Sequence, residues 1–124
     1  PLRKVQDIDN AIEKIVSNNG DSIIGLTKAE KHPYWMMEIN NGKVSPFAES
    51  KRKDYTRRQD LPDIYNINGA IYITKTKLFK RTLCRWAGKT LPYIMPKERS
   101  IDIDDMIDWK LAELMLEEEE NGDI

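Results

Sequence analysis

The chain opens with apolar positions at helical spacing, followed by a short strand pattern. The apolar positions recur every three or four residues, at Ile8, Ala11, Ile12, Ile15 and Val16. Asp7 stands where a helix cap is expected, and Gly20 follows the last turn as a stop signal. The next segment, 22–27, is almost continuously apolar, as in a strand covered on both faces. The pattern predicts a helix that lies on one side of a sheet.

The middle of the chain departs from this pattern. Two short stretches between 34 and 47 flank Asn41-Gly42, a dipeptide that supplies the positive φ angles of a tight hairpin turn. Residues 48–63 are strongly polar and have no clear period, which is typical of a loop or short helix outside the core. We therefore expect an antiparallel excursion from the sheet over about 34–66.

Helix and strand patterns return after residue 68. Residues 69–74 and 93–95 have strand composition, and 76–83 predict a short helix. We expect this helix to direct Leu78, Phe79 and Leu83 inward. The last segment predicts a helix that is capped by Asp104 or Asp105 and has an apolar stripe comprising Ile107, Leu111, Leu114 and Met115. Together these elements predict an α/β domain.

Length and composition limit the classes of protein that fit. With 124 residues, 40% of them hydrophobic, the chain can form one modest core rather than two. Its 20 basic and 21 acidic side chains give a net charge of -1, so no global charge attracts nucleic acid or an anionic membrane. No apolar run is long enough to span a bilayer. Because Cys84 is the single cysteine, no internal disulfide can form, and we expect a reducing, cytoplasmic setting.

Two aspartates alternate with two isoleucines near the end of the chain. In an extended segment, Ile101 and Ile103 lie on one side, and Asp102 and Asp104 lie on the other. Two carboxylates held together repel each other, and a divalent cation removes that repulsion. Mg²⁺ typically binds one or two protein carboxylates together with phosphate oxygens and water, which suits this pair. The alternative is that Asp104 only caps the last helix and that Asp102 is a solvated loop residue.

A second group of polar side chains lies around Arg58, Gln59 and Asn68. An arginine fork can bind a carboxylate or phosphate through two hydrogen bonds, and Gln and Asn suit amides and hydroxyls. The group would fit an acidic, hydroxylated ligand, although composition alone favours a solvated basic loop. Residues 51–58 also combine positive charge with Tyr55, which leaves a nucleic-acid surface open. No nucleic-acid-binding motif accompanies them.

Five strings stand in a fixed order along the chain. They are Pro1-Leu2-Arg3 with Asp7-Ile8-Asp9, His32-Pro33-Tyr34-Trp35, Arg58-Gln59-Asp60-Leu61-Pro62, Asn68-Gly69-Ala70-Ile71-Tyr72-Ile73 and Ser100-Ile101-Asp102-Ile103-Asp104. Together they resemble the motifs of the acylneuraminate cytidylyltransferase family over nearly the whole chain. The third and fifth strings are the specific ones.

The resemblance implies a Rossmann-like nucleotidyltransferase fold, of which 1–124 would be the C-terminal part, and a homodimer whose protruding segment exchanges between subunits. It implies transfer of CMP from CTP to sialic, legionaminic or a related nine-carbon acidic sugar, with release of pyrophosphate. Asp102 and Asp104 would be catalytic residues that bind Mg²⁺. The sugar site would be lined by Arg58, Gln59, Asn68 and Tyr72. Neither a nucleic acid nor a membrane is expected as a partner.

Two departures from the family pattern bear on function. In the family, a glycine-containing loop with an arginine and a lysine cradles the triphosphate, and 1–124 contains no such loop. We therefore expect most of the CTP site to be missing from this chain. Asp105 stands where the family usually has threonine or serine, and it adds charge beside Asp104. The alternative function is a non-catalytic, dimerising interaction module derived from the family.

Overall fold

The computed structural model describes residues 2–48 and 61–121, which belong to two compact units. The first unit combines 1–27 with 66–124. The second unit, 28–65, is inserted between these two parts of the sequence. Helices and strands both occur, which confirms the α/β class.

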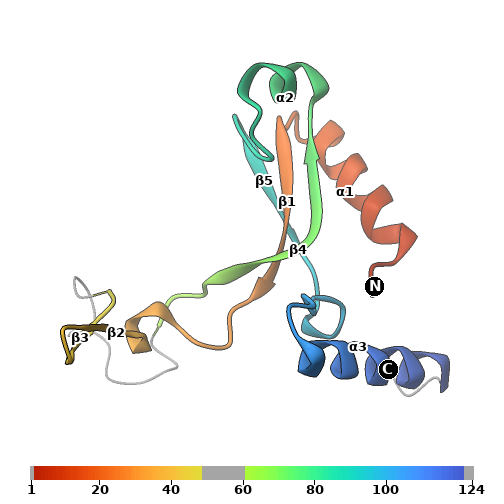
Figure 1. Ribbon diagram of the computed structural model, residues 1–124. Coiled ribbons are helices and arrows are strands. Elements are labelled where there is room, and N and C mark those ends of the chain that lie inside the picture. Colours follow the sequence, from red (N-terminus) through yellow and green to blue (C-terminus); the bar gives the residue numbers. More distant parts are fainter. Residues whose placement is uncertain (1, 49–60, 122–124) are drawn as a thin grey trace. The chain divides into compact units, whose positions relative to one another are not determined.

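A three-stranded sheet with the order β4-β1-β5 forms the first unit (Figure 1). The central strand is β1 (Ser22–Lys28), with β4 (Tyr65–Thr74) and β5 (Thr90–Ile94) on either side. β1 and β5 are parallel, with Ser22 opposite Thr90. β1 and β4 run in opposite directions, because Lys75 N donates to Asp21 O beyond one end of the pair and Ala29 N donates to Ile64 O beyond the other.

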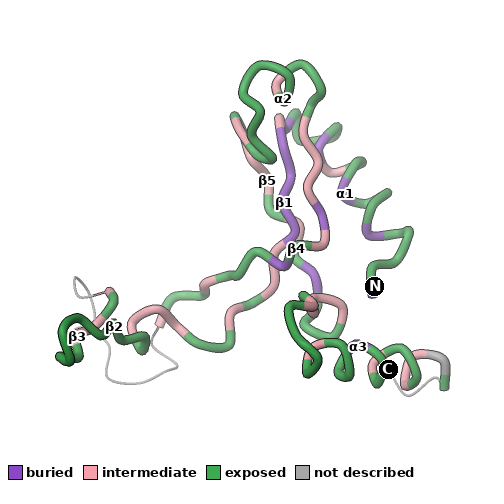
Figure 2. The backbone as a smooth tube through the Cα atoms, in the orientation of Figure 1, coloured by how far each residue is buried: buried purple, intermediate pink, exposed green. Residues whose placement is uncertain are grey.

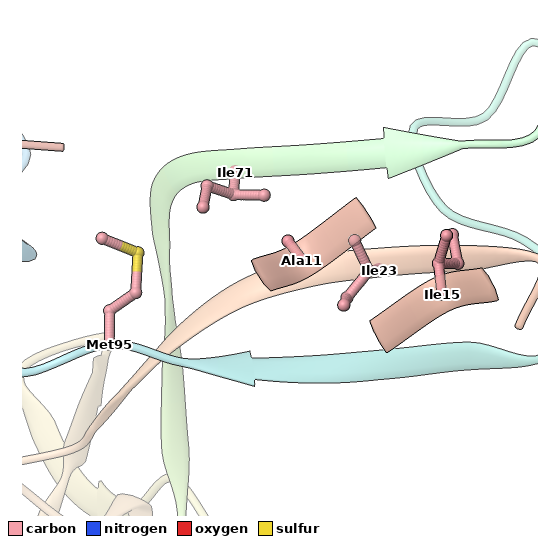
Figure 3. Packing of buried hydrophobic residues seen from close by; sticks show 5 residues of the cluster. All are labelled: Ala11, Ile15, Ile23, Ile71 and Met95. Atoms are coloured by element: carbon pink, nitrogen blue, oxygen red, sulfur yellow. The ribbon is translucent and has the colours of Figure 1, made fainter. Parts of the chain in front are cut away.

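The core lies between this sheet and α1 (Val5–Ser17). It contains Ala11, Ile15, Ile23, Ile71 and Met95 (Figure 3). Residues 22–25 of β1 are all buried, which confirms a strand covered on both faces, and Figure 2 shows this burial along the strand. The other apolar positions of the helical pattern are exposed, at 42% for Ile8, 46% for Ile12 and 74% for Val16.

The two remaining helices of this unit are largely exposed. In α2 (Thr76–Thr82) no residue is buried, and the prediction that Phe79 and Leu83 point inward is wrong, since they are 44% and 80% exposed. In α3 (Met106–Asn121) the residue that packs inward is Ala112, while most of the predicted apolar stripe is exposed. A sheet of three strands offers too little surface to cover every apolar side chain. Among the described residues, no helix is long and apolar enough to cross a membrane.

The second unit contains the predicted hairpin. Strands β2 (Met37–Asn40) and β3 (Lys43–Pro46) pair antiparallel, with Ile39 opposite Val44. Asn41 and Gly42 have φ angles of 52° and 74°, as the turn between them requires. A short 3₁₀ helix, η1 (Pro33–Trp35), precedes the hairpin and is capped by the His32 side chain.

Candidate functional site

Asn68 lies in β4, the strand that bends beside Ile71 in Figure 3, and its side chain is held by several contacts. It is 4% exposed. Its Nδ2 donates to Ser100 Oγ at 3.0 Å and contacts Met95 Sδ at 3.2 Å, and its Oδ1 accepts from Ala70 N at 3.1 Å. The hydrogen bond to Ser100 attaches residues 100–104, the segment that carries Asp102 and Asp104 (the aspartate segment), to the sheet.

The carboxylate of Asp102 lies directly over Gly69, the residue after Asn68. Gly69 has a φ of +67°, and a Cβ added there would lie 2.9 Å from Asp102 Oδ2. The absence of a side chain at Gly69 is what lets the carboxylate approach the strand. A cavity of about 240 Å³ opens here, lined by Leu2, Arg3, Asn68, Gly69, Ala70, Arg99, Ile101, Asp102 and Ile103. Thus two of the predicted site residues, Asn68 and Asp102, line one cavity.

Asp102 and Asp104 are both exposed, while Ile101 and Ile103 are half-buried, so the predicted alternation is confirmed. Within the described part of the chain, neither carboxylate has a hydrogen-bond or ion-pair partner. The helix cap is Asp105, whose Oδ1 accepts from the backbone N–H groups of residues 107 and 108 at 2.7 and 3.0 Å. Asp104 is therefore free of the capping role considered above.

Asp102 and Asp104 are too few to form a closed structural metal site. Residues 2–48 and 61–121 contain no group of three or more His, Cys, Asp or Glu side chains that could hold a metal ion. A structural zinc site requires four protein ligands. Mg²⁺ usually keeps several waters and binds one or two carboxylates together with substrate phosphates. Of the two predicted ligands, Asp102 lines the cavity and Asp104 does not.

An ion pair between buried Asp7 and half-buried Arg99 lies beside the cavity, and no sequence pattern predicted it. Asp7 is 3% exposed, and its Oδ2 lies 2.5 Å from Arg99 Nη1. Tyr93 donates its hydroxyl to Asp7 Oδ1 at 3.2 Å. Burial raises the pKa of Tyr93, and the negative charge of Asp7 acts in the same direction. Sequence patterns marked Asp7 only as a cap, because its partner Arg99 lies far along the chain.

Arg3 also lines the cavity, and the sequence motifs gave it no role in the site. Its Nη1 donates to the carbonyl oxygen of Ala70. This contact brings a permanent positive charge to the wall that also holds Asp102. An arginine near the start of a chain has no periodic signal, so only the fold reveals its position.

The other predicted site residues are not brought to this cavity. Tyr72 is absent from its lining and stacks on Trp86 instead, with ring centroids 5.8 Å apart and the Arg85 guanidinium 5.2 Å from the Tyr72 ring centroid. Arg58 and Gln59 lie outside the described residues, as do all the residues of the basic stretch 51–58. Their roles stay predictions.

Comparisons with known proteins agree with the sequence motifs. No family model matches the chain. Post-translational flagellin modification protein B of Campylobacter coli is 32% identical over 95% of this chain and 49% of its own length. The N-acylneuraminate cytidylyltransferase of Streptococcus agalactiae serotype V is 34% identical over 84% of this chain and 25% of its own length. The CMP-N,N'-diacetyllegionaminic acid synthase of Legionella pneumophila is 30% identical over 94% of this chain and 50% of its own length. The chain thus spans half or less of the length of these curated relatives.

Proposed function

Because the chain belongs to the acylneuraminate cytidylyltransferase family, we propose that it takes part in the transfer of CMP from CTP to a nine-carbon acidic sugar such as sialic or legionaminic acid. In this proposal 1–124 supplies metal-binding and sugar-binding residues, and residues outside it complete the CTP site. The observation that carries the proposal is the Asp102 carboxylate, which is exposed, has no described partner and is held over Gly69 at the wall of a cavity.

The reaction would be an in-line attack of the sugar's anomeric hydroxyl on the α-phosphorus of CTP, with pyrophosphate leaving. Mg²⁺ bound by Asp102 and Asp104 would neutralise charge on the phosphates and on the leaving group. Asp102 is also our candidate for accepting the hydroxyl proton. Arg3, which lines the same cavity, would add a positive charge facing an anionic substrate.

The sugar site would involve Arg58, Gln59, Asn68 and Tyr72. We propose that Arg58 binds the sugar carboxylate through its guanidinium fork and that Gln59 binds neighbouring polar groups. The amide of Asn68 is already bonded to Ser100 and Ala70, so we expect it to shape the pocket wall rather than to donate to the sugar. Tyr72 would have to leave its stack on Trp86 to reach the cavity.

The fold and assembly proposed with this function are a Rossmann-like domain and a homodimer. The parallel pairing of β1 with β5 and the packing of α1 on the sheet support the first. Support for the second comes from the hairpin, whose apolar side chains are exposed, at 74% for Ile39 and 64% for Val44. Exposed apolar groups in a continuous patch are typical of a surface that contacts another chain. A non-catalytic dimerising module would use the same surface.

Pyrophosphate release from CTP tests this function. The chain should be assayed with sialic, legionaminic and pseudaminic acids, alone and together with the part of the C. coli relative that it does not match. We expect turnover in the combined sample and its loss in the Asp102→Asn variant, whereas Asp9→Asn, an exposed position on α1, should keep it. Wild-type turnover by Asp102→Asn would show that the metal role is wrong. A stable dimer that binds neither CTP nor sugar in either sample would favour the interaction module.

A further inference from the structure

The burial of Asp7 exceeds what its place in the helix explains. At the third position of α1, its Oδ2 accepts from Lys4 N at 3.0 Å, which is the ordinary contact of a capping box. Such a contact is made at the surface and needs no further partners. Here the carboxylate is also bound by the Arg99 guanidinium and the Tyr93 hydroxyl, and its side chain is 5% exposed. Burying a carboxylate costs free energy even when the group is paired, so a carboxylate buried to this extent needs a further reason.

Arg99 connects this ion pair to the aspartate segment. It is the last residue of η4 (Lys97–Arg99), and Ser100 follows it directly. Ser100 Oγ accepts from Asn68 Nδ2 at 3.0 Å and donates to Pro96 O at 2.8 Å. Two residues later, Asp102 lies against Gly69. The segment that carries the carboxylate is therefore held at its beginning by Arg99 and Ser100.

We propose that Asp7, acting through Arg99, is a positioning residue for Asp102. The ion pair fixes the start of the 100–104 segment, so that the Asp102 carboxylate faces the cavity instead of turning away. Because the two Asp102 oxygens have no described partner of their own, their position depends on how the backbone of this segment is held. The functional meaning of this role rests on the proposed function, in which Asp102 binds the metal.

The test compares Asp7→Asn with Asp9→Asn in the full chain. Both variants make the same chemical change on α1, but Asp9 is exposed and takes no part in the Asp7–Arg99 ion pair. One readout is the dissociation constant for Mn²⁺, used in place of Mg²⁺ and located by the broadening of backbone amide signals. The other is the hydrogen-exchange protection of the amides at 99–104 relative to those of β1. Arg99→Lys, which keeps the charge but not the planar fork, is the conservative variant.

We expect Asp7→Asn to weaken Mn²⁺ binding by about tenfold, the lower end for losing a group that orients a metal ligand. Protection at 99–104 should fall while protection in β1 stays unchanged. Arg99→Lys should give a smaller loss of both, and Asp9→Asn should match wild type. A variant Asp7→Asn that loses stability but keeps wild-type Mn²⁺ affinity and wild-type protection at 99–104 would overturn the positioning role.

Two outcomes separate this role from the proposed function. If the wild-type chain does not bind Mn²⁺ near Asp102, the proposed metal binding by Asp102 is wrong. The hydrogen-exchange protection at 99–104 then decides alone whether Asp7 positions Asp102. Lower protection at 99–104 in Asp7→Asn supports the positioning role, and unchanged protection overturns it. If Asp7→Asn does not fold, Arg99→Lys and Tyr93→Phe are measured instead, because each weakens one contact of the same carboxylate. Wild-type behaviour in both would equally overturn the role.

Discussion

Gly69 offers a sharp way to separate the stability of the fold from the position of Asp102. The change is Gly69→Ala, and its control is Gly88→Ala in the same unit. The two glycines have nearly equal φ angles, +67° and +65°, and at each a Cβ would meet an aspartate carboxylate. At Gly69 this is Asp102, with Oδ2 at 2.9 Å, and at Gly88 it is Asp21, with Oδ2 at 2.6 Å.

The expected magnitudes follow from what each carboxylate does. The left-handed backbone costs any non-glycine residue about 1–2 kcal/mol, so this part is shared by both variants. Asp102 has no described partner and can move away without losing a hydrogen bond, so Gly69→Ala should lose little beyond that amount. Asp21 accepts from Lys89 N at 3.0 Å and from Lys75 Nζ at 3.2 Å. Disturbing these bonds adds about 0.5–1.5 kcal/mol each, so Gly88→Ala should be the less stable variant.

For Mn²⁺ affinity we expect the opposite order, with Gly69→Ala more affected than Gly88→Ala. To reach ordinary contact, which begins at 3.4 Å, the Asp102 carboxylate must move by roughly half an ångström in Gly69→Ala. We expect Mn²⁺ affinity to fall by about tenfold, or ~1.4 kcal/mol, in this variant and to stay unchanged in Gly88→Ala. Denaturant unfolding measures the free energy of unfolding of each variant, and Mn²⁺ titration measures its dissociation constant for the metal. Equal Mn²⁺ affinity in all three proteins would refute the claim that Gly69 sets the position of a metal ligand.

Three further predictions concern the sheet, the pH dependence of stability and the hairpin. Gly25→Ala places a Cβ 2.5 Å from Asn68 Oδ1 and should lower the unfolding free energy by about 1–3 kcal/mol, and a variant as stable as wild type in urea would contradict this packing. The hydrogen bond from the Lys89 backbone lowers the pKa of Asp21 below its usual 3.8. The ionised Asp21 carboxylate therefore stabilises the fold fully above pH 3.8, its usual pKa, and this stabilisation is lost as the pH falls through the lower pKa of the folded state. The stability difference between wild type and Asp21→Asn should accordingly be constant near neutral pH and shrink in acid, and a gap that persists at the lowest pH would show that charge is not its cause. Ile39→Lys should dissociate the proposed dimer in sedimentation experiments while the hairpin amide signals persist, and a wild-type chain that is monomeric at every concentration would exclude the dimer.

Local patterns predicted the elements of this fold well. The continuous apolar run of β1 and the Asn-Gly turn between β2 and β3 each have one physical interpretation, and both are confirmed. Inward-facing positions were harder to predict. The periodicity of α1 and α3 shows which side chains share a face, but it cannot show how much surface the sheet offers to cover them. Ala11 and Ile15 of α1 are buried in the core, whereas Ile107, on the apolar stripe of α3, is 75% exposed.

The site was only partly predictable for the same kind of reason. The alternation of aspartate and isoleucine at 101–104 is a local pattern, and the structure confirms the exposure it predicts. The partners that hold this segment come from distant parts of the chain. Asn68 reaches Ser100, and Asp7 reaches Arg99, contacts that no spacing or composition could indicate. Sequence therefore predicted that the carboxylates are exposed, and the fold revealed which residues contact their segment.

The base of the inserted unit has a consequence for how such a protein can diversify. Ala29 N donates to Ile64 O at 2.9 Å, and Lys28 Nζ lies 2.7 Å from Asp63 Oδ1, so the two ends of 28–65 meet side by side. Doubling the length of a closed loop costs only about 0.6 kcal/mol in chain entropy. We therefore expect a change in the length of 28–65 to cost little chain entropy as long as its two ends still meet. Such a change would leave the strand that carries Asn68 and Gly69, and with it the contact to Asp102, as it is.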